Sequence, residues 1–265
     1  MTQRWKLTLE YDGTNFCGWQ RQENALSVQE VLEKAVFGFC AEQVTSYAAG
    51  RTDSGVHALG QVAHIDLEKD ADEKTVRDAI NFHLRPHPVA VVRAQKTASD
   101  FHARTSARKR VYCYKILSAR WAEPVIAKNR VWHVPRALDL AAMNKAAAFL
   151  LGEHDFTSFR ASECQAASPV KTLDRLDITE VEDAMFGRHL QLWAEARSFL
   201  HHQIRNITGT LKLVGEGKWM PEQVQEALAA KDRTKAGPMA PACGLYFVRV
   251  EYNETPILNA IDSLL

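Results

Sequence analysis

The stretch AAGRTDSGVHALGQVAH, residues 48–64, places one acid, Asp53, between Gly50 and Gly55 and is flanked by segments in which apolar and polar residues alternate. The two glycines have the spacing of a phosphate-binding loop, but Val-His follows where that motif needs Lys and Ser or Thr. The phosphate-loop interpretation therefore fails. Glycine on both sides instead predicts a tight turn between two strands, with room for another molecule's backbone to approach.

Outward from this turn, the periodicity of apolar residues predicts an α+β fold. Ser27 is expected to open a helix, with Glu30 completing a capping box, and Gly152 to cap the end of another. Strands are expected at 5–11, before Gly50, and at 61–67, 89–96, 110–117, 176–181, 189–196 and 245–252. Helices are expected after Ser27, at 72–84, 139–151 and 201–214, and after Pro221. Because strands often follow strands, the sheet should be largely antiparallel, with helices packed against it.

Composition sets limits on the class of protein. The chain has 265 residues, of which 46% are hydrophobic and 25% charged, so it can bury a substantial core. Neither an apolar run of membrane-spanning length nor a signal sequence is visible, and the protein is expected to be cytoplasmic without membrane contact. Five scattered cysteines without CxxC spacing predict neither a disulfide framework nor a zinc site.

The net charge of +1 means that binding of nucleic acid would depend on local patches. One such patch, residues 101–122, holds six basic residues and no acid. Within it, strand alternation in RKRVYCYK (108–115) puts Arg110, Tyr112 and Tyr114 on one face. Rings that alternate with cations suit single-stranded nucleic acid, which offers bases to stack and phosphates to neutralise. The alternative is a half-buried strand whose basic side chains reach out to solvent.

A third stretch, ARSFLHHQIRN (196–206), combines His201 and His202 with Arg205. Together with Asp53 and His57 the histidines suggest a metal site, but adjacent residues on a helix point about 100° apart. No HxxxH pair is present either, so no metal is expected. Arg205 lies on an apolar helix face and, if buried, needs an acid or an anion; Asp53 is one candidate. Asp53 could otherwise be a turn residue that bonds its own backbone.

Taken together, GRTDSGVHALGQVAH, FHAR (101–104) with Tyr112, and SFLHHQIRN resemble the tRNA pseudouridine synthase A family, the tRNA pseudouridine(38–40) synthases. Further blocks that resemble this family are YDGTNFCGWQRQ (11–22), GEHDFTSFR (152–160) and AAKDRTKAGPMAPACGLYF (229–247). The blocks occur in the family's order over nearly the whole chain. Two departures are visible: Ser54 stands where the family often has Ala, and Val111 stands where an Arg is common.

The resemblance implies the pseudouridine synthase fold, with two similar halves (1–105 and 106–265) that share a mixed sheet, a basic central cleft and a homodimeric assembly. It implies that Asp53 is the catalytic residue, that Tyr112 lies in the active site, and that Arg205 pairs with Asp53. The expected activity is the cofactor-free isomerisation of uridine to pseudouridine in the anticodon stem-loop of tRNA. RNA contacts are expected from the following basic residues: Arg51, Arg104, Arg108, Arg110, His201 and His202.

Two other function classes remain as alternatives. A non-catalytic RNA-binding protein would use the tyrosine and arginine strand and would have no need of Asp53. A metal- or histidine-dependent hydrolase would use Asp53 with His57, His201 and His202, although these residues lack the spacing of a ligand cluster.

Overall fold

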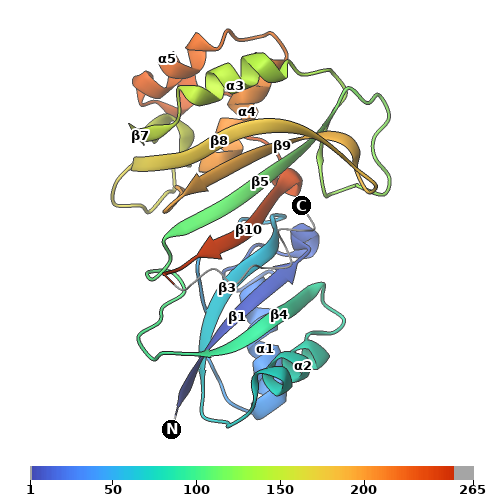
Figure 1. The fold of residues 1–265 in the computed structure, drawn as a ribbon, viewed down its shortest axis with the longest axis vertical. Helices are drawn as coiled ribbons and strands as arrows, with labels where there is room; N and C mark the ends of the chain where they lie inside the picture. The colour runs from blue at the N-terminus through green and yellow to red at the C-terminus, as the bar shows by residue number, and fades with distance from the viewer. Residues whose placement is uncertain (1, 254–265) are drawn as a thin grey trace. The chain divides into compact units, whose positions relative to one another are not determined.

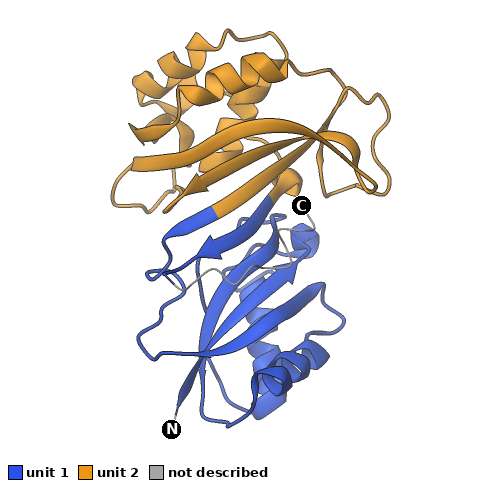
Figure 2. Ribbon diagram, in the orientation of Figure 1, with its two compact units in different colours: residues 1–110, 246–265 blue, residues 111–245 orange. Residues whose placement is uncertain are grey.

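The computed structural model describes residues 2–253 (Figure 1). The chain forms two compact units: unit 1 contains residues 1–110 and 246–265, and unit 2 contains residues 111–245 (Figure 2). Each unit combines a sheet with helices, so the predicted α+β class is confirmed. In the described part of the chain, no helix has the length and apolar character needed to cross a bilayer.

The sheet of unit 1 has the strand order β4 (Val89–Thr97), β1 (Gln3–Tyr11), β3 (His57–Leu67) and β10 (Leu245–Glu251). Strand β1 runs antiparallel to β3 and β4, β10 runs parallel to β3, and the short β2 (Tyr47–Ala48) pairs antiparallel with β3. The sequence-based division assigns the last strand to the second half of the chain, whereas its partner β3 belongs to unit 1.

Helices α1 (Val28–Cys40) and α2 (Glu73–Leu84) pack together in unit 1, and Gly38 of α1 lies against the ring of His83. The side chain of Ser27 accepts a hydrogen bond from the N–H of Glu30, as the capping pattern predicts. The carboxylate of Glu30, however, accepts a hydrogen bond from Lys34 one turn later. The expected reciprocal capping box is therefore replaced by an ion pair within the helix.

The sheet of unit 2 has the strand order β5 (Lys109–Ser118), β9 (Gly187–Ala196), β8 (Val170–Asp183) and β7 (Gly152–Asp155). The short β6 (Trp132–Val134) runs parallel to β5, and β8 runs antiparallel to both β7 and β9. Its helices are α3 (Leu140–Ala148), α4 (Gln203–Gly215) and α5 (Glu222–Ala230). The sequence predicted neither β6 nor β7, because both are too short for an alternating pattern to be seen.

Two helix boundaries differ from the prediction. Helix α3 ends at Ala148, and its last turns tighten to bonds that span three residues, such as Leu150 N to Ala147 O. Gly152, with a φ of +88°, then begins β7 rather than capping α3. Helix α4 begins at Gln203, two residues later than predicted, since His202 takes a left-handed conformation with a φ of +63°.

Candidate active site

Asp53 lies in the turn between β2 and β3 of unit 1, and its side chain is half-buried. The turn is held by a second loop, residues 12–19, that follows β1. Asp53 forms an isolated antiparallel bridge with Gly18, and the N–H of Trp19 donates to the carbonyl of Thr52 at 3.0 Å. The N–H of Gly55 and the hydroxyl of Ser54 both donate to the carbonyl of Phe16. The acid is thus presented by two interlocked loops.

Glycines make this contact possible. A Cβ on Gly13 would lie 2.0 Å from the carbonyl oxygen of Val56, and one on Gly18 would lie 2.4 Å from that of Thr52. Gly18 also has a φ of +106°, which favours glycine. The backbones of the two loops therefore touch where any larger residue would separate them.

Buried polar side chains form hydrogen bonds that hold the turn at Asp53 in place. The hydroxyls of Tyr11 and Thr52 lie 2.8 Å apart, and the amide of Gln61 donates to the carbonyl of Gly50 at 2.7 Å. Burial raises the pKa of Tyr11 to about 12, so its hydroxyl keeps its proton at neutral pH. Gly50 and Thr52, which precede the acid in the turn, are thereby held by neutral groups.

His57 is part of this support. Its ring is 2% exposed, stacks on Tyr246 with 4.8 Å between centroids, and accepts a hydrogen bond at Nδ1 from the N–H of Gly13. Its burial makes His57 a contact between the two loops, and its Nδ1 also lies 3.3 Å from the carboxylate of Asp12.

The basic residues near the turn fall into two groups. Arg51, Arg104 and Arg108 are exposed. Arg110 is 7% exposed, and its guanidinium donates to the carbonyl of Ala49 from Nε and Nη2 and to that of Arg104 from Nη2. Because those carbonyls belong to the two segments that carry Asp53 and Arg104, Arg110 ties these segments together.

Tyr112 and Arg205 belong to unit 2. The Tyr112 ring is 8% exposed and packs edge-on against Phe199, with 5.1 Å between centroids. Arg205, on α4, is 9% exposed, and its Nε donates to the carbonyl of Ala240 at 2.9 Å. The N–H of Ala240 returns a bond to the carbonyl of Arg205 at 3.0 Å. This reciprocal pair orients the guanidinium.

The segment 235–244 lies directly on α4. A Cβ on Gly209 would lie 1.7 Å from the carbonyl oxygen of Pro238, and the hydroxyl of Thr210 accepts a bond from the N–H of Gly237. The loop glycines and this segment belong to blocks that carried the family resemblance, but sequence reasoning gave them no role. The paired glycines five residues apart, Gly13 and Gly18, were the signal that could have identified the supporting loop.

His201 and His202 both precede α4, and their ring centroids lie 3.8 Å apart. The sequence argument that two adjacent histidines on a helix must point apart is therefore wrong for this pair. The left-handed backbone of His202 brings the two rings together. His201 is exposed and His202 is half-buried.

Comparisons with known proteins identify the family of this chain. The family described as tRNA pseudouridine synthase matches residues 8–106 and 146–253. A tRNA pseudouridine synthase A of Paramagnetospirillum magneticum is 57% identical over 94% of this chain and 95% of its own length. Those of Rhodospirillum centenum and Acidiphilium cryptum are each 56% identical, over 94% and 96% of this chain and 100% and 98% of their own lengths. The match includes the loop that carries Asp53 and the helix that carries Arg205, and the chain belongs to the tRNA pseudouridine synthase family.

Proposed function

We propose that this protein isomerises uridine to pseudouridine at positions 38, 39 and 40 of tRNA, with Asp53 as the catalytic residue. The observation that carries the proposal is the turn at Asp53. One half-buried carboxylate is presented by two interlocked loops inside a chain of this family. A turn residue that only bonded its own backbone would need no such support.

The reaction breaks the bond between C1' and N1, turns the uracil and joins C1' to C5. Atoms and electrons balance within the nucleotide, so the chemistry needs no cofactor. The base must leave its stack and enter a closed pocket, where it can turn without escaping. An ionised Asp53 can begin the reaction as a nucleophile at C1' or C6, or as the base that removes the 2' proton.

In this proposal Arg205 pairs with Asp53 and stabilises its negative charge when the uracil covers it, since a nearby cation compensates a carboxylate for the loss of water. Tyr112 stacks on the turned base. The packing of its ring against Phe199 supports this role, because a fixed ring loses little freedom on stacking.

We further propose that the exposed cations Arg51, Arg104 and Arg108 hold tRNA phosphates, together with His201 and His202, and that two copies of the chain form a homodimer in the cytoplasm. Arg110 acts on RNA indirectly, because its hydrogen bonds to Ala49 and Arg104 position the segments that bear the other cations.

Replacement of the carboxylate tests the proposal. We expect Asp53→Asn to abolish tritium release from tRNA labelled at C5 of uridine, because an amide can neither attack carbon nor accept the 2' proton. Binding of tRNA should remain within a few-fold of the wild type. The matched control is Ser54→Ala, one residue away, where the hydroxyl donates only to the Phe16 carbonyl and full turnover is expected.

Clear tritium release by Asp53→Asn would remove Asp53 from the mechanism. A wild-type protein that binds tRNA but releases no tritium would instead establish the non-catalytic RNA-binding alternative. Loss of wild-type turnover in excess chelator would favour a metal-dependent reaction.

A further inference from the structure

Three aromatic side chains of unit 1 form a cluster, in which Tyr47 and His64 are stacked and His102 lies edge-on to His64. Tyr47 lies on β2, and its ring stacks on that of His64, its partner on β3, with centroids 5.0 Å apart and planes at 18°. His102, in the FHAR segment, lies 5.7 Å from Tyr47 and 4.7 Å from His64. Tyr47 is 50% exposed, whereas His64 is 2% exposed. One ring of the stack is therefore open to solvent and rests on a buried support.

The imidazole of His64, on which Tyr47 stacks, is uncharged at neutral pH. Nδ1 of His64 accepts a hydrogen bond from the N–H of Ala103 at 3.2 Å. Burial and the nearby charges of His102 and Arg4 lower the pKa of His64 to about 4. Nδ1 of His102 accepts hydrogen bonds from the N–H groups of Arg104 and Thr105. Both imidazoles thus accept hydrogen bonds from the backbone of the segment that carries Arg104.

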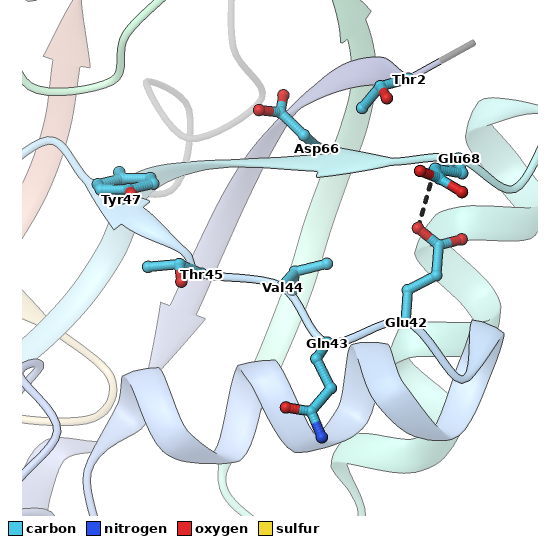
Figure 3. A pocket seen from close by; sticks show the side chains of 8 residues that line it. All are labelled: Thr2, Glu42, Gln43, Val44, Thr45, Tyr47, Asp66 and Glu68. Carbon is cyan, nitrogen blue, oxygen red and sulfur yellow. Dashed lines mark hydrogen bonds between the residues drawn. The ribbon is translucent and has the colours of Figure 1, made fainter.

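Acidic side chains and an exposed arginine both occur in the segments around Tyr47. Tyr47 lines an open hollow of about 490 Å³, and Figure 3 shows Tyr47 at one end of it and Glu42 and Glu68 at the other. The carboxylate of Glu42 accepts bonds from the N–H groups of Glu68 and Lys69, and Asp66 pairs with Arg4. A phosphate would be repelled by the acidic end of this hollow.

Arg104 follows His102 by two residues. Its N–H donates to His102, its carbonyl accepts from Arg110, and its side chain is exposed. Through Arg110 the same segment is bonded to Ala49, two residues after Tyr47 and one before the Asp53 turn begins. The open ring of Tyr47 and the exposed cation of Arg104 are the two elements that bind an unpaired nucleotide, a face for the base and a charge for its phosphate.

We propose that Tyr47 is a stacking platform for one unpaired base of the tRNA substrate, outside the pocket of the reacting uridine, and that Arg104 holds the phosphate of the same nucleotide. This proposal rests on the proposed function, because it assigns a further contact to the same substrate. A base stacked on a preformed ring sacrifices little side-chain freedom, so the contact should contribute to affinity rather than to the chemical step.

The test is the dissociation constant of unmodified tRNA together with the single-turnover rate of pseudouridine formation at saturating enzyme. Stacking of one base contributes about 1–3 kcal/mol, so Tyr47→Ala should weaken tRNA binding by roughly 5- to 150-fold. The single-turnover rate should stay within about twofold of the wild type. Tyr47→Phe, which keeps the ring, should bind tRNA like the wild type. Phe82→Ala removes an exposed ring on α2 and is the matched control, expected to have no effect.

Should Tyr47→Ala fail to fold, Tyr47→Leu takes its place, since leucine keeps an apolar side chain without a flat face and should show the same loss of affinity. Wild-type affinity of these variants overturns the platform, as does a Tyr47→Phe variant as weak as Tyr47→Ala, which would assign the contact to the hydroxyl. Absence of pseudouridine formation by the wild type contradicts the proposed function instead, so the two failures are distinguishable.

Discussion

The imidazole of His64 shows how the surroundings of a single residue change its pKa. It is 2% exposed, and its pKa is lowered from 6.5 to about 4, first by burial and then by the charges of His102 and Arg4; Asp66 acts weakly in the opposite direction. The folded protein therefore binds the proton more weakly than the unfolded chain does. In the window between pH 6.5 and 4 the unfolded state carries more protons, so acid favours unfolding there.

We expect the free energy of unfolding to fall as the pH drops from about 6.5 towards 4, with His64 contributing at most about 3 kcal/mol of that loss. Above this window its contribution to stability is fully present. Urea unfolding at a series of pH values measures the effect. The His64→Gln variant cannot titrate in this range, and its stability should change less with pH; parallel curves for the two proteins would contradict the assignment.

Arg110 shows what a pattern in the sequence can miss at this scale. Alternation placed Arg110 on a face with Tyr112 and Tyr114, and the strand itself is confirmed. The same alternation is expected whether the guanidinium of Arg110 binds a phosphate or backbone carbonyls. Which of these applies depends on Ala49 and Arg104, and the sequence does not show that their carbonyls converge on one guanidinium.

Among the elements, α4 makes a close backbone contact with the segment that precedes β10. Gly209 meets the carbonyl of Pro238, one turn after Arg205 forms its reciprocal hydrogen bonds with Ala240. Alanine normally stabilises a helix interior by about 1 kcal/mol relative to glycine. Here a Cβ would overlap backbone 1.7 Å away, and the backbone of neither segment can rotate aside as a side chain could.

We therefore expect Gly209→Ala to lower the free energy of unfolding by about 2 kcal/mol or more and to reduce pseudouridine formation, because the displaced segment would release Arg205. Gly215→Ala, at the end of the same helix, is the matched control. Its Cβ would meet the flexible thioether of Met143 at 2.6 Å, so a loss below about 1 kcal/mol is expected. Urea unfolding measures the stability of both variants, and tritium release measures their activity. Equal losses in the two variants would show that the contact between Gly209 and Pro238 is not the cause.

The ends of helices and the contacts between loops explain why the sequence predicted most of the fold but not the geometry of the candidate site. The apolar stripe of α4 is confirmed, since Ile204, Ile207 and Leu211 are at most 5% exposed. Its start was placed two residues early because nothing in His201 or His202 signals a left-handed residue. The close approach of the loop at Gly18 likewise depends on chain segments far apart in sequence. Periodicity reports burial within an element, whereas these contacts lie between elements.

At the scale of the whole molecule, the net charge of +1 gives little attraction for RNA. Affinity for tRNA must therefore come from local cations, and it should be sensitive to which cation is removed rather than to how much charge is lost. Arg104 and Arg77 offer a comparison within unit 1. Arg104 is exposed beside the stacked rings, whereas Arg77 lies on α2 and pairs with Asp78.

Each variant, Arg104→Gln and Arg77→Gln, lowers the net charge by one. If Arg104 holds a phosphate, binding of tRNA by the variant releases the counterions of one phosphate fewer. The slope of the logarithm of the tRNA binding constant against the logarithm of the salt concentration should then become shallower by roughly 0.7 to 0.9. Arg77→Gln should leave the slope unchanged, because only a contacted phosphate releases counterions on binding. Titrations of tRNA at several salt concentrations measure both slopes. Equal changes in the two slopes would mean that tRNA responds to the total charge of the protein, and Arg104 would then hold no particular phosphate.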